Sequence, residues 1–297
     1  MDGHTYKQSA SLGMGVSSSF AEVTRNLAET ARGEARPEDL VLIEHYSAVI
    51  VRAMKDIFIA DAHLTDPNDA SYRHLVDFLT TQCGQIRHLV LLGDIFEFWV
   101  GYRHCVFSAY LPLLQVLQQL QANGTQIVTV EGNHDFHMGP FFSESLKSTI
   151  FPDGGTIKLD DLNVYLCHGD TIAATPNYLR LRRFFRSSFA KTLIRILPAD
   201  TTWGISEILG NASRKRRASQ PKRQHTLPEA LIKQHASQHF KDGCEAFLCG
   251  HFHQAYQQQL AQHPVIVVGN WGQTCHYAVH ENGQFRLEVY QPDSAND

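Results

Sequence analysis

Five short polar clusters recur along this chain, each directly after a short apolar run. The runs are about four residues long, which is short for a helix and typical of a buried strand. Every cluster contains Asp, Asn or His. The clusters are Asp61-Ala62-His63, Gly93-Asp94, Gly132-Asn133-His134-Asp135, His168-Gly169-Asp170 and Gly250-His251-Phe252-His253. Because loops converge where the strands of an open α/β sheet end, the pattern predicts one shared site at those ends.

Strand-like and helix-like segments alternate along most of the chain. Asn123-Gly124 is a typical helix stop, and Asn282-Gly283 is a typical hairpin turn. Strands are expected at 56–60, 89–92, 127–130, 164–167, 246–249 and 265–268, helices at 72–80 and 110–121, and a hairpin at 276–280 with 285–290. This alternation predicts an α/β fold with a buried sheet.

Composition narrows the class of protein. Of the 297 residues, 43% are hydrophobic and 19% are charged, so a packed core is expected. The net charge of -4 argues against general nucleic-acid binding. The chain shows no signal peptide, no apolar run long enough to span a bilayer and no Cys-x-x-Cys pair among its six cysteines. These features predict a cytoplasmic protein.

Three regions differ in character. Residues 1–53 are expected to form an N-terminal extension that is either disordered or not translated, since Met54 directly precedes the first strand. Residues 54–292 form the main domain. Within it, residues 174–227 hold twelve Lys and Arg against two acidic residues, with Leu, Ile and Phe interleaved. This segment is predicted to be a helical cap, and an amphipathic helical pair with a solvated basic face is the alternative.

Metal binding explains the clusters better than turns that arise by chance. Asp61 and His63 are separated by one residue, as are His251 and His253, so each pair can point to one side of an extended chain. Oxygen and imidazole ligands together suit Mn²⁺, Fe²⁺ or Zn²⁺. Any one cluster alone could be an ordinary turn. Five of them in this order make a site far more probable than any single one does.

The ordered set of clusters resembles the calcineurin-like metallophosphoesterases, over about residues 55–290. The resemblance implies a four-layer αββα sandwich with a helical cap insertion. It also implies two divalent metal ions that share one carboxylate. One ion would be held by Asp61, His63, Asp94 and His253, and the other by Asp94, Asn133, His168 and His251. Two such ions clamp the attacking and leaving oxygens of a phosphoryl displacement.

Two further residues of the third cluster have candidate catalytic roles. By the resemblance, His134 stabilises or protonates the leaving oxygen. Asp135 either orients His134 or caps the following helix, and the sequence leaves both roles open.

A closer resemblance extends the clusters to residues 93–101, 132–139, 168–171 and 269–271. These segments are similar to the UDP-2,3-diacylglucosamine diphosphatase family of lipid A synthesis, whose members also carry a helical insertion after His-Gly-Asp. The resemblance implies an anionic nucleotide-lipid substrate, cleavage to UMP and a diacylglucosamine 1-phosphate, and Mn²⁺ as the metal. It also implies peripheral attachment to the cytoplasmic face of the inner membrane. Tyr178, Arg182 and Arg183 are the predicted substrate contacts.

The chain departs from that family at two places. Well-known members have Arg where this chain has His134, and an Asp pair that follows their fourth motif is replaced here around Thr175-Pro176. Other substrates therefore stay open: a nucleotide, a nucleotide-sugar, a phosphodiester or a phosphoprotein. A non-catalytic scaffold and a nuclease are the remaining alternatives, and complete ligand retention argues against the scaffold.

Overall fold

The protein is described from a computed structural model, which covers residues 54–205, 208 and 226–292. The predicted N-terminal extension, 1–53, lies outside these residues, and so does part of the predicted cap. Among the described residues, no helix has both the length and the apolar character needed to cross a membrane.

Two sheets form the centre of the domain. From edge to edge, the first sheet contains β11 (Gln284–Val289), β10 (His276–Glu281), β1 (Lys55–Ile59), β2 (Ile86–Leu91), β3 (Gln126–Val130) and β4 (Thr149–Phe151). The second contains β5 (Gly155–Leu159), β6 (Leu162–Cys167), β7 (Ala246–Cys249), β9 (His263–Val267) and β8 (Tyr256–Leu260). Strands β1 to β4 are parallel, as are β6, β7 and β9. Parallel pairing brings the carboxyl ends of the central strands to one edge of each sheet.

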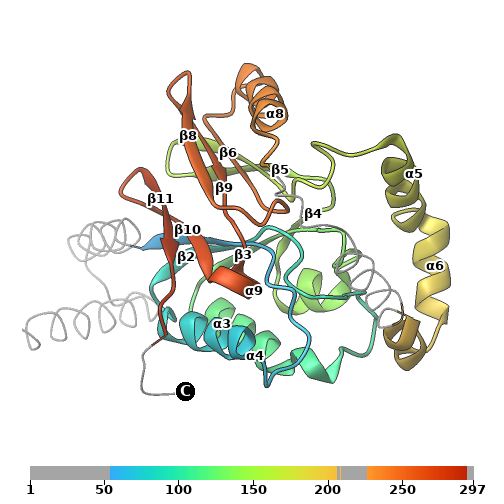
Figure 1. The fold of residues 1–297 in the computed structure, drawn as a ribbon. Helices are drawn as coiled ribbons and strands as arrows, with labels where there is room; N and C mark the ends of the chain where they lie inside the picture. The colour runs from blue at the N-terminus through green and yellow to red at the C-terminus, as the bar shows by residue number, and fades with distance from the viewer. Residues whose placement is uncertain (1–53, 206–207, 209–225, 293–297) are drawn as a thin grey trace, which may run out of the picture. The chain divides into compact units, whose positions relative to one another are not determined.

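Side chains that alternate along the strands build a layered core. In β1, Ile57 and Ile59 pack against the helices, whereas Phe58 faces the second sheet. Helices α3 (Ala70–Thr81) and α4 (Leu111–Ala122) cover the outer face of the first sheet. Helix α8 (Glu229–Lys241) covers the outer face of the second (Figure 1). The predicted αββα sandwich is therefore confirmed.

Most of the expected elements match in position. The six predicted strands correspond to β1, β2, β3, β6, β7 and β9, the two predicted helices to α3 and α4, and the predicted hairpin to β10 and β11. Strands β4, β5 and β8 and helix α8 were not predicted.

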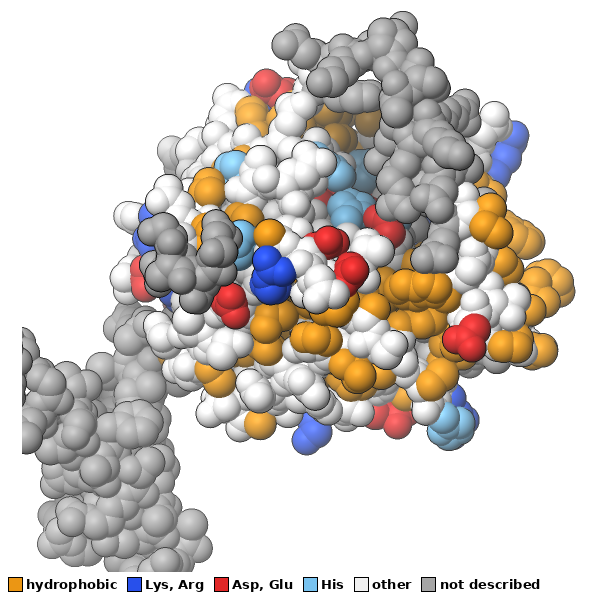
Figure 2. Space-filling model, turned by 60° about the horizontal axis from the view of Figure 1, so that its bottom comes forward, with side chains coloured by type: hydrophobic (Ala, Val, Ile, Leu, Met, Phe, Trp, Pro, Cys, Tyr) orange, Lys and Arg blue, Asp and Glu red, His pale blue; other side chains and the backbone are white. Residues whose placement is uncertain are grey.

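The predicted cap is helical wherever it is described. Helices α5 (Pro176–Phe185) and α6 (Ser188–Ile196) are each capped by a hydroxyl. The Thr175 hydroxyl accepts a hydrogen bond from the backbone N–H of Tyr178, and the Ser187 hydroxyl accepts one from that of Ala190. Residues 199–205 are also helical. The cap exposes many large apolar side chains, which gather on one side of the molecule (right in Figure 2). They include Leu179, Leu181, Phe184, Phe189, Leu193 and Ile196.

A buried charge network lies near the amino end of β1. Asp56 is fully buried, and its carboxylate accepts hydrogen bonds from Arg87 at 2.6 and 2.9 Å. The Nδ1 atoms of His88 and His280 each lie 2.8 Å from the same carboxylate. Burial alone raises the pKa of Asp56, but these hydrogen bonds outweigh it and hold the pKa below the ordinary 3.8.

Replacing Asp56 by Asn is expected to destabilise the fold by about 3–5 kcal/mol at pH 7, because Arg87 would lose its buried partner. The folded-state pKa of Asp56 lies below the unfolded value, so its contribution is present above about pH 4 and is lost as the pH falls below it. Urea unfolding between pH 7 and pH 3 measures both effects. An Asn variant as stable as the wild type at pH 7 would contradict the prediction.

Candidate metal centre

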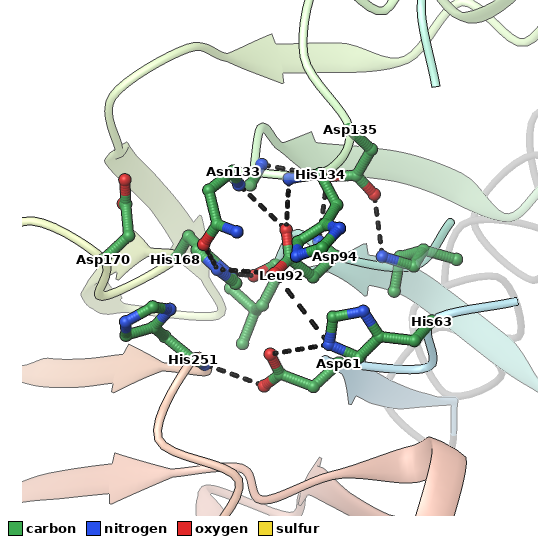
Figure 3. Close-up of polar contacts among 12 residues, drawn as sticks. Asp61, His63, Leu92, Asp94, Asn133, His134, Asp135, His168, Asp170 and His251 are labelled. Atoms are coloured by element: carbon green, nitrogen blue, oxygen red, sulfur yellow. Dashed lines mark hydrogen bonds and ion pairs between the residues drawn. The ribbon is translucent and has the colours of Figure 1, made fainter. Parts of the chain in front are cut away.

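All seven predicted ligand residues lie just beyond the carboxyl ends of central strands. Strand β1 leads to Asp61 and His63, β2 to Asp94, and β3 to Asn133. Strand β6 leads to His168 and β7 to His251 and His253. Figure 3 shows the side chains from these strand ends pointing toward one another. The structure thus brings together residues that are up to 192 positions apart, from 61 to 253.

The ligand atoms form two adjoining groups. Asp61, His63 and His253 make one group, and Asp94, His168 and His251 make the other, with the ligand atoms of each group within 4.8 Å of one another. The resemblance implies the same two groups, with two additions: Asn133 in the second group, and Asp94 shared by both groups.

Asp94 lies between the two groups. Its Oδ2 atom is 3.9 Å from His63 Nε2 in the first group and 3.4 Å from His168 Nε2 in the second. Asn133 Oδ1 is 3.3 Å from His168 Nε2, which places the amide oxygen in the second group. In the first group, Asp61 Oδ1 lies 3.5 Å from His253 Nε2. The geometry therefore suits a carboxylate that bridges two cations.

The backbone of the ligand residues is strained. Asp61, His63, Asp94, His251 and His253 all have positive φ angles, between 47° and 71°. Non-glycine residues rarely adopt this left-handed conformation, and it costs free energy that the surrounding structure must offset. Its concentration at the strand ends marks these loops as shaped for function rather than for stability.

Two ligand atoms make no hydrogen bond to any of the described residues. Among the described residues, four buried polar side-chain atoms make no hydrogen bond, and two of them are Asp61 Oδ1 and His63 Nε2. A buried polar atom without a partner is costly, and metal coordination satisfies it. The donor set, carboxylate, amide and imidazole without thiolate, fits Mn²⁺, Fe²⁺ or Zn²⁺.

The electrostatics of the two carboxylates also fit bound cations. Burial raises the pKa of Asp61, against the opposing charges of His168 and His63. Burial likewise raises the pKa of Asp94, but the charge and hydrogen bond of His168 outweigh it and leave the pKa low. Burial and the charge of His168 lower the pKa of His251 to about 4.

Glycines let the loops of the second and third clusters approach closely. A Cβ atom on Gly93 would lie 2.6 Å from Nδ1 of His168. A Cβ atom on Gly132 would lie 2.2 Å from Oδ1 of Asp94. Both distances are far below van der Waals contact, so any larger residue would displace a predicted ligand.

Several predicted ligands are oriented by a second contact. His168 Nδ1 is 2.8 Å from the carbonyl oxygen of Leu92, and His63 Nδ1 is 3.2 Å from the carboxylate of Glu97. The side-chain nitrogen of Asn270 lies 2.5 Å from Nδ1 of His253. Such contacts fix the ring of a metal-binding His. Neither Glu97 nor Asn270 was predicted as a site residue, although both lie within the motif segments 93–101 and 269–271.

Replacing Asn270 by Ala is expected to weaken Mn²⁺ binding by about 10- to 100-fold, because the His253 ring loses its fixed orientation. Asn270 also caps α9 (Trp271–Thr274) by accepting a hydrogen bond from Gln273. Asn270→Ser is therefore the matched control, since Ser keeps a cap but cannot reach His253. Titration with Mn²⁺ measures both variants. If Asn270→Ser binds Mn²⁺ like the wild type while Asn270→Ala does not, the cap and not the ring contact is responsible.

Asp135 has a role that differs from both predicted ones. Its carboxylate accepts backbone hydrogen bonds from Asp94 at 2.8 Å, Ile95 at 2.7 Å and Gly132 at 3.0 Å. These contacts join the loops of the second and third clusters. The carboxylate thus neither orients His134 nor caps a helix, because its oxygens are turned toward these amides.

His134 lines the cavity at the metal centre. Its backbone N–H donates to Asp94 Oδ1 at 2.8 Å, and its Nδ1 lies 2.9 Å from the carbonyl oxygen of Glu97. The Nδ1–H is thereby held on a carbonyl, which leaves Nε2 as the atom available for proton transfer. The cavity has a volume of about 500 Å³ and is lined by His63, Asp94, Asn133, His134, His251, Phe252, His253 and Gln254.

The three predicted substrate contacts lie in different surroundings. Tyr178 donates a hydrogen bond to Asp170 at 2.7 Å. Arg182 bonds Asp170 at 2.7 Å and Asp153 at 2.5 Å. Arg183 is exposed. Helix α5 is thus bonded to the loop that follows His168, but the Tyr178 and Arg182 side chains are engaged with acidic residues.

Comparison with curated proteins finds relatives with one shared name. The UDP-2,3-diacylglucosamine hydrolase of Ralstonia nicotianae is 32% identical over 48% of this chain and 53% of its own length. The protein of that name from Pseudomonas syringae is 30% identical over 53% of this chain and 64% of its own length. The one from Pseudomonas fluorescens is 27% identical over 72% of this chain and 86% of its own length. The chain thus spans about half to two thirds of the first two relatives.

Solved structures and family models complete the comparison. The structure of an archaeal phosphodiesterase aligns over 80% of this chain and 100% of its own length, with 14% identity and a TM-score of 0.42. A similarity this low supports no conclusion about substrate. The family model described as calcineurin-like phosphoesterase matches residues 54–255, which include all seven predicted ligands. The chain therefore belongs to the calcineurin-like phosphoesterase family.

Proposed function

We propose that the protein hydrolyses the pyrophosphate of UDP-2,3-diacylglucosamine to UMP and 2,3-diacylglucosamine 1-phosphate, with two divalent ions, preferentially Mn²⁺. The observation that carries the proposal is a metal centre joined to an apolar and basic cap. Helix α5 bonds Asp170, which directly follows the ligand loop of His168, and it exposes Leu181 and Phe184. A substrate with phosphates at one end and acyl chains at the other matches both surfaces. The names of the curated relatives support the same substrate.

The chain's own residues suit the chemistry. Divalent ions bound at this centre supply Lewis-acid activation of water and of the phosphate oxygens. Water adds to one phosphorus and loses a proton to solvent, the bond to the bridging oxygen breaks, and that oxygen leaves with the other phosphate. His134 lines the cavity with its Nδ1 held on the Glu97 carbonyl, so Nε2 is the ring atom that donates the proton that the leaving oxygen needs. The Glu97 carboxylate lies 3.9 Å from His134 Nδ1.

We further propose that the cap lies against the cytoplasmic face of the inner membrane. Phe189 and Ile196 are 68% and 74% exposed, and Arg183 and Lys191 lie on the same pair of helices. Apolar side chains beside basic ones suit shallow binding to an anionic leaflet. Sedimentation with vesicles that contain anionic lipid tests this part of the proposal. Protein that stays in the supernatant would contradict it.

A substrate comparison tests the reaction itself. Turnover with Mn²⁺ is compared for UDP-2,3-diacylglucosamine, UDP-glucose and bis(p-nitrophenyl) phosphate. We expect kcat/KM to be at least about 100-fold higher for the lipid than for UDP-glucose, since burying four methylene groups contributes about 3 kcal/mol. Equal turnover of UDP-glucose would favour a nucleotide-sugar hydrolase. Preference for the diester would favour a general phosphodiesterase.

A further inference from the structure

Arg186, at the end of α5, bonds directly to the loop that carries Asn133 and His134. Its guanidinium donates to the carbonyl oxygens of Gly132 at 2.8 Å and Glu131 at 3.3 Å, and also to that of Pro152. It pairs with the Glu131 carboxylate at 3.1 Å. One side chain from the cap therefore contacts the two residues that directly precede Asn133.

The arrangement is buried and closely fitted. The Arg186 side chain is 12% exposed and that of Glu131 is 6% exposed. A guanidinium so far from water needs several acceptors in a fixed geometry, and its planar fork meets carbonyl and carboxylate oxygens at once. Lysine offers a single point charge and cannot reproduce these contacts.

The far end of the same loop is also tied to α5. Glu131 accepts a second hydrogen bond, from the backbone N–H of Met138 at 3.1 Å. His137 Nε2 lies 3.0 Å from the carbonyl oxygen of Phe185. Arg186 thus holds the start of the Glu131–Met138 loop. The end of the loop is held by the carbonyl oxygen of Phe185 and by the carboxylate of Glu131.

A shift of this loop would reach the metal centre. The backbone N–H groups of Asn133 and His134 both donate to Asp94 Oδ1, at 2.8 Å each. Moving Gly132 would therefore displace the Asn133 amide, the His134 ring and the carboxylate of Asp94 together.

We propose that Arg186 is a positioning residue that holds the Asn133–His134 loop in its metal-binding geometry and so couples the cap to the metal centre. The inference rests on the metal centre but not on the identity of the substrate. Arg186 touches neither the ligand atoms nor the cavity lining; it acts through the backbone of Glu131 and Gly132.

Mn²⁺ binding to the full chain tests the proposal without any substrate. Arg186→Ala and Arg186→Lys are titrated with Mn²⁺ and followed by electron paramagnetic resonance. We expect one of the two ions to bind about 10- to 100-fold more weakly in both variants, the range seen when a supporting contact of a metal ligand is removed. Added guanidinium ion is expected to restore affinity in Arg186→Ala, where it can fill the space left, and not in Arg186→Lys.

Steady-state hydrolysis of bis(p-nitrophenyl) phosphate supplies a second readout. A misplaced loop lowers kcat and leaves KM nearly unchanged, whereas loss of a substrate contact raises KM. Arg180→Ala is the matched control, because it removes an exposed guanidinium from the same helix, where Arg180 donates to the side chain of Asn177 at 3.3 Å. This control is expected to keep wild-type affinity for both Mn²⁺ ions.

The outcomes separate this proposal from others. Folded Arg186 variants that bind both ions as tightly as the wild type would overturn it. Thermal unfolding identifies any variant that fails to fold, and if Arg186→Ala does so, Arg186→Lys decides the matter. Failure to cleave UDP-2,3-diacylglucosamine would reject only the substrate proposed above, since the Mn²⁺ titration does not depend on it.

Discussion

Replacing Asp94 by Ala or Asn is expected to reduce turnover by at least about a thousandfold. Asp94 is the carboxylate between the two ligand groups, 3.9 Å from His63 and 3.4 Å from His168. A clamp on the reacting phosphate contributes several kcal/mol to transition-state stabilisation, and about 4 kcal/mol corresponds to a thousandfold in rate. Turnover with Mn²⁺ measures the loss of activity, and the number of Mn²⁺ ions bound per chain measures the loss of the shared ligand.

The Asn variant separates the charge of Asp94 from its structural contacts. Asn keeps an oxygen that can accept the hydrogen bonds from the backbone of Asn133 and His134, so the loop should retain its shape. Asp77→Asn, on the exposed face of α3, controls for the loss of a negative charge elsewhere. Wild-type turnover in Asp94→Asn would refute a mechanism that depends on a shared carboxylate.

The buried parallel strands were predictable because both of their faces are apolar. Strands β2, β7 and β9 each contain an uninterrupted apolar stretch, since helices cover one face and the other sheet covers the second. The predicted carboxyl ends of these strands lie within one residue of those observed, whereas β2 begins three residues before its predicted start. Helix α4 was equally clear, because Leu113, Leu117 and Leu120 repeat at the helical period and are all buried.

The missed strands lie at or near sheet edges, where packing does not impose an apolar pattern. Strand β8 contains exposed Gln257, Gln258 and Gln259, so its pairing with β9 leaves no trace in hydrophobicity. Strand β4 has only three residues. Helix α8 has just two buried residues, Ile232 and Ala236, which is too sparse a stripe to recognise in sequence.

The clustering of the candidate metal ligands was predictable because each of them directly follows its strand in the sequence. The residues that support them were harder to identify, because their roles depend on contacts between distant segments. Glu97 reaches His63 across 34 positions, and Arg186 reaches Glu131 across 55. The role of Asp135 was mistaken for the same reason: its partners at Asp94 and Ile95 are 41 and 40 positions away.

Replacing His134 by Ala is expected to lower kcat for a pyrophosphate substrate by about a thousandfold, within the 100- to 10,000-fold range for loss of a general acid. Its Nδ1 is held by the Glu97 carbonyl, and its ring lines the cavity between the ligand groups. His104→Ala, which removes an exposed imidazole, is the control and is expected to leave kcat unchanged. Steady-state kinetics with saturating Mn²⁺ measures both variants.

The leaving group distinguishes a proton donor from a residue that only shapes the cavity. A phosphate leaving from a pyrophosphate gains from a proton in the transition state, whereas p-nitrophenolate leaves well without one. His134→Ala should therefore slow hydrolysis of bis(p-nitrophenyl) phosphate far less than hydrolysis of the pyrophosphate. Equal losses on both substrates would show that the His134 side chain supports the site through its contact with Glu97 instead.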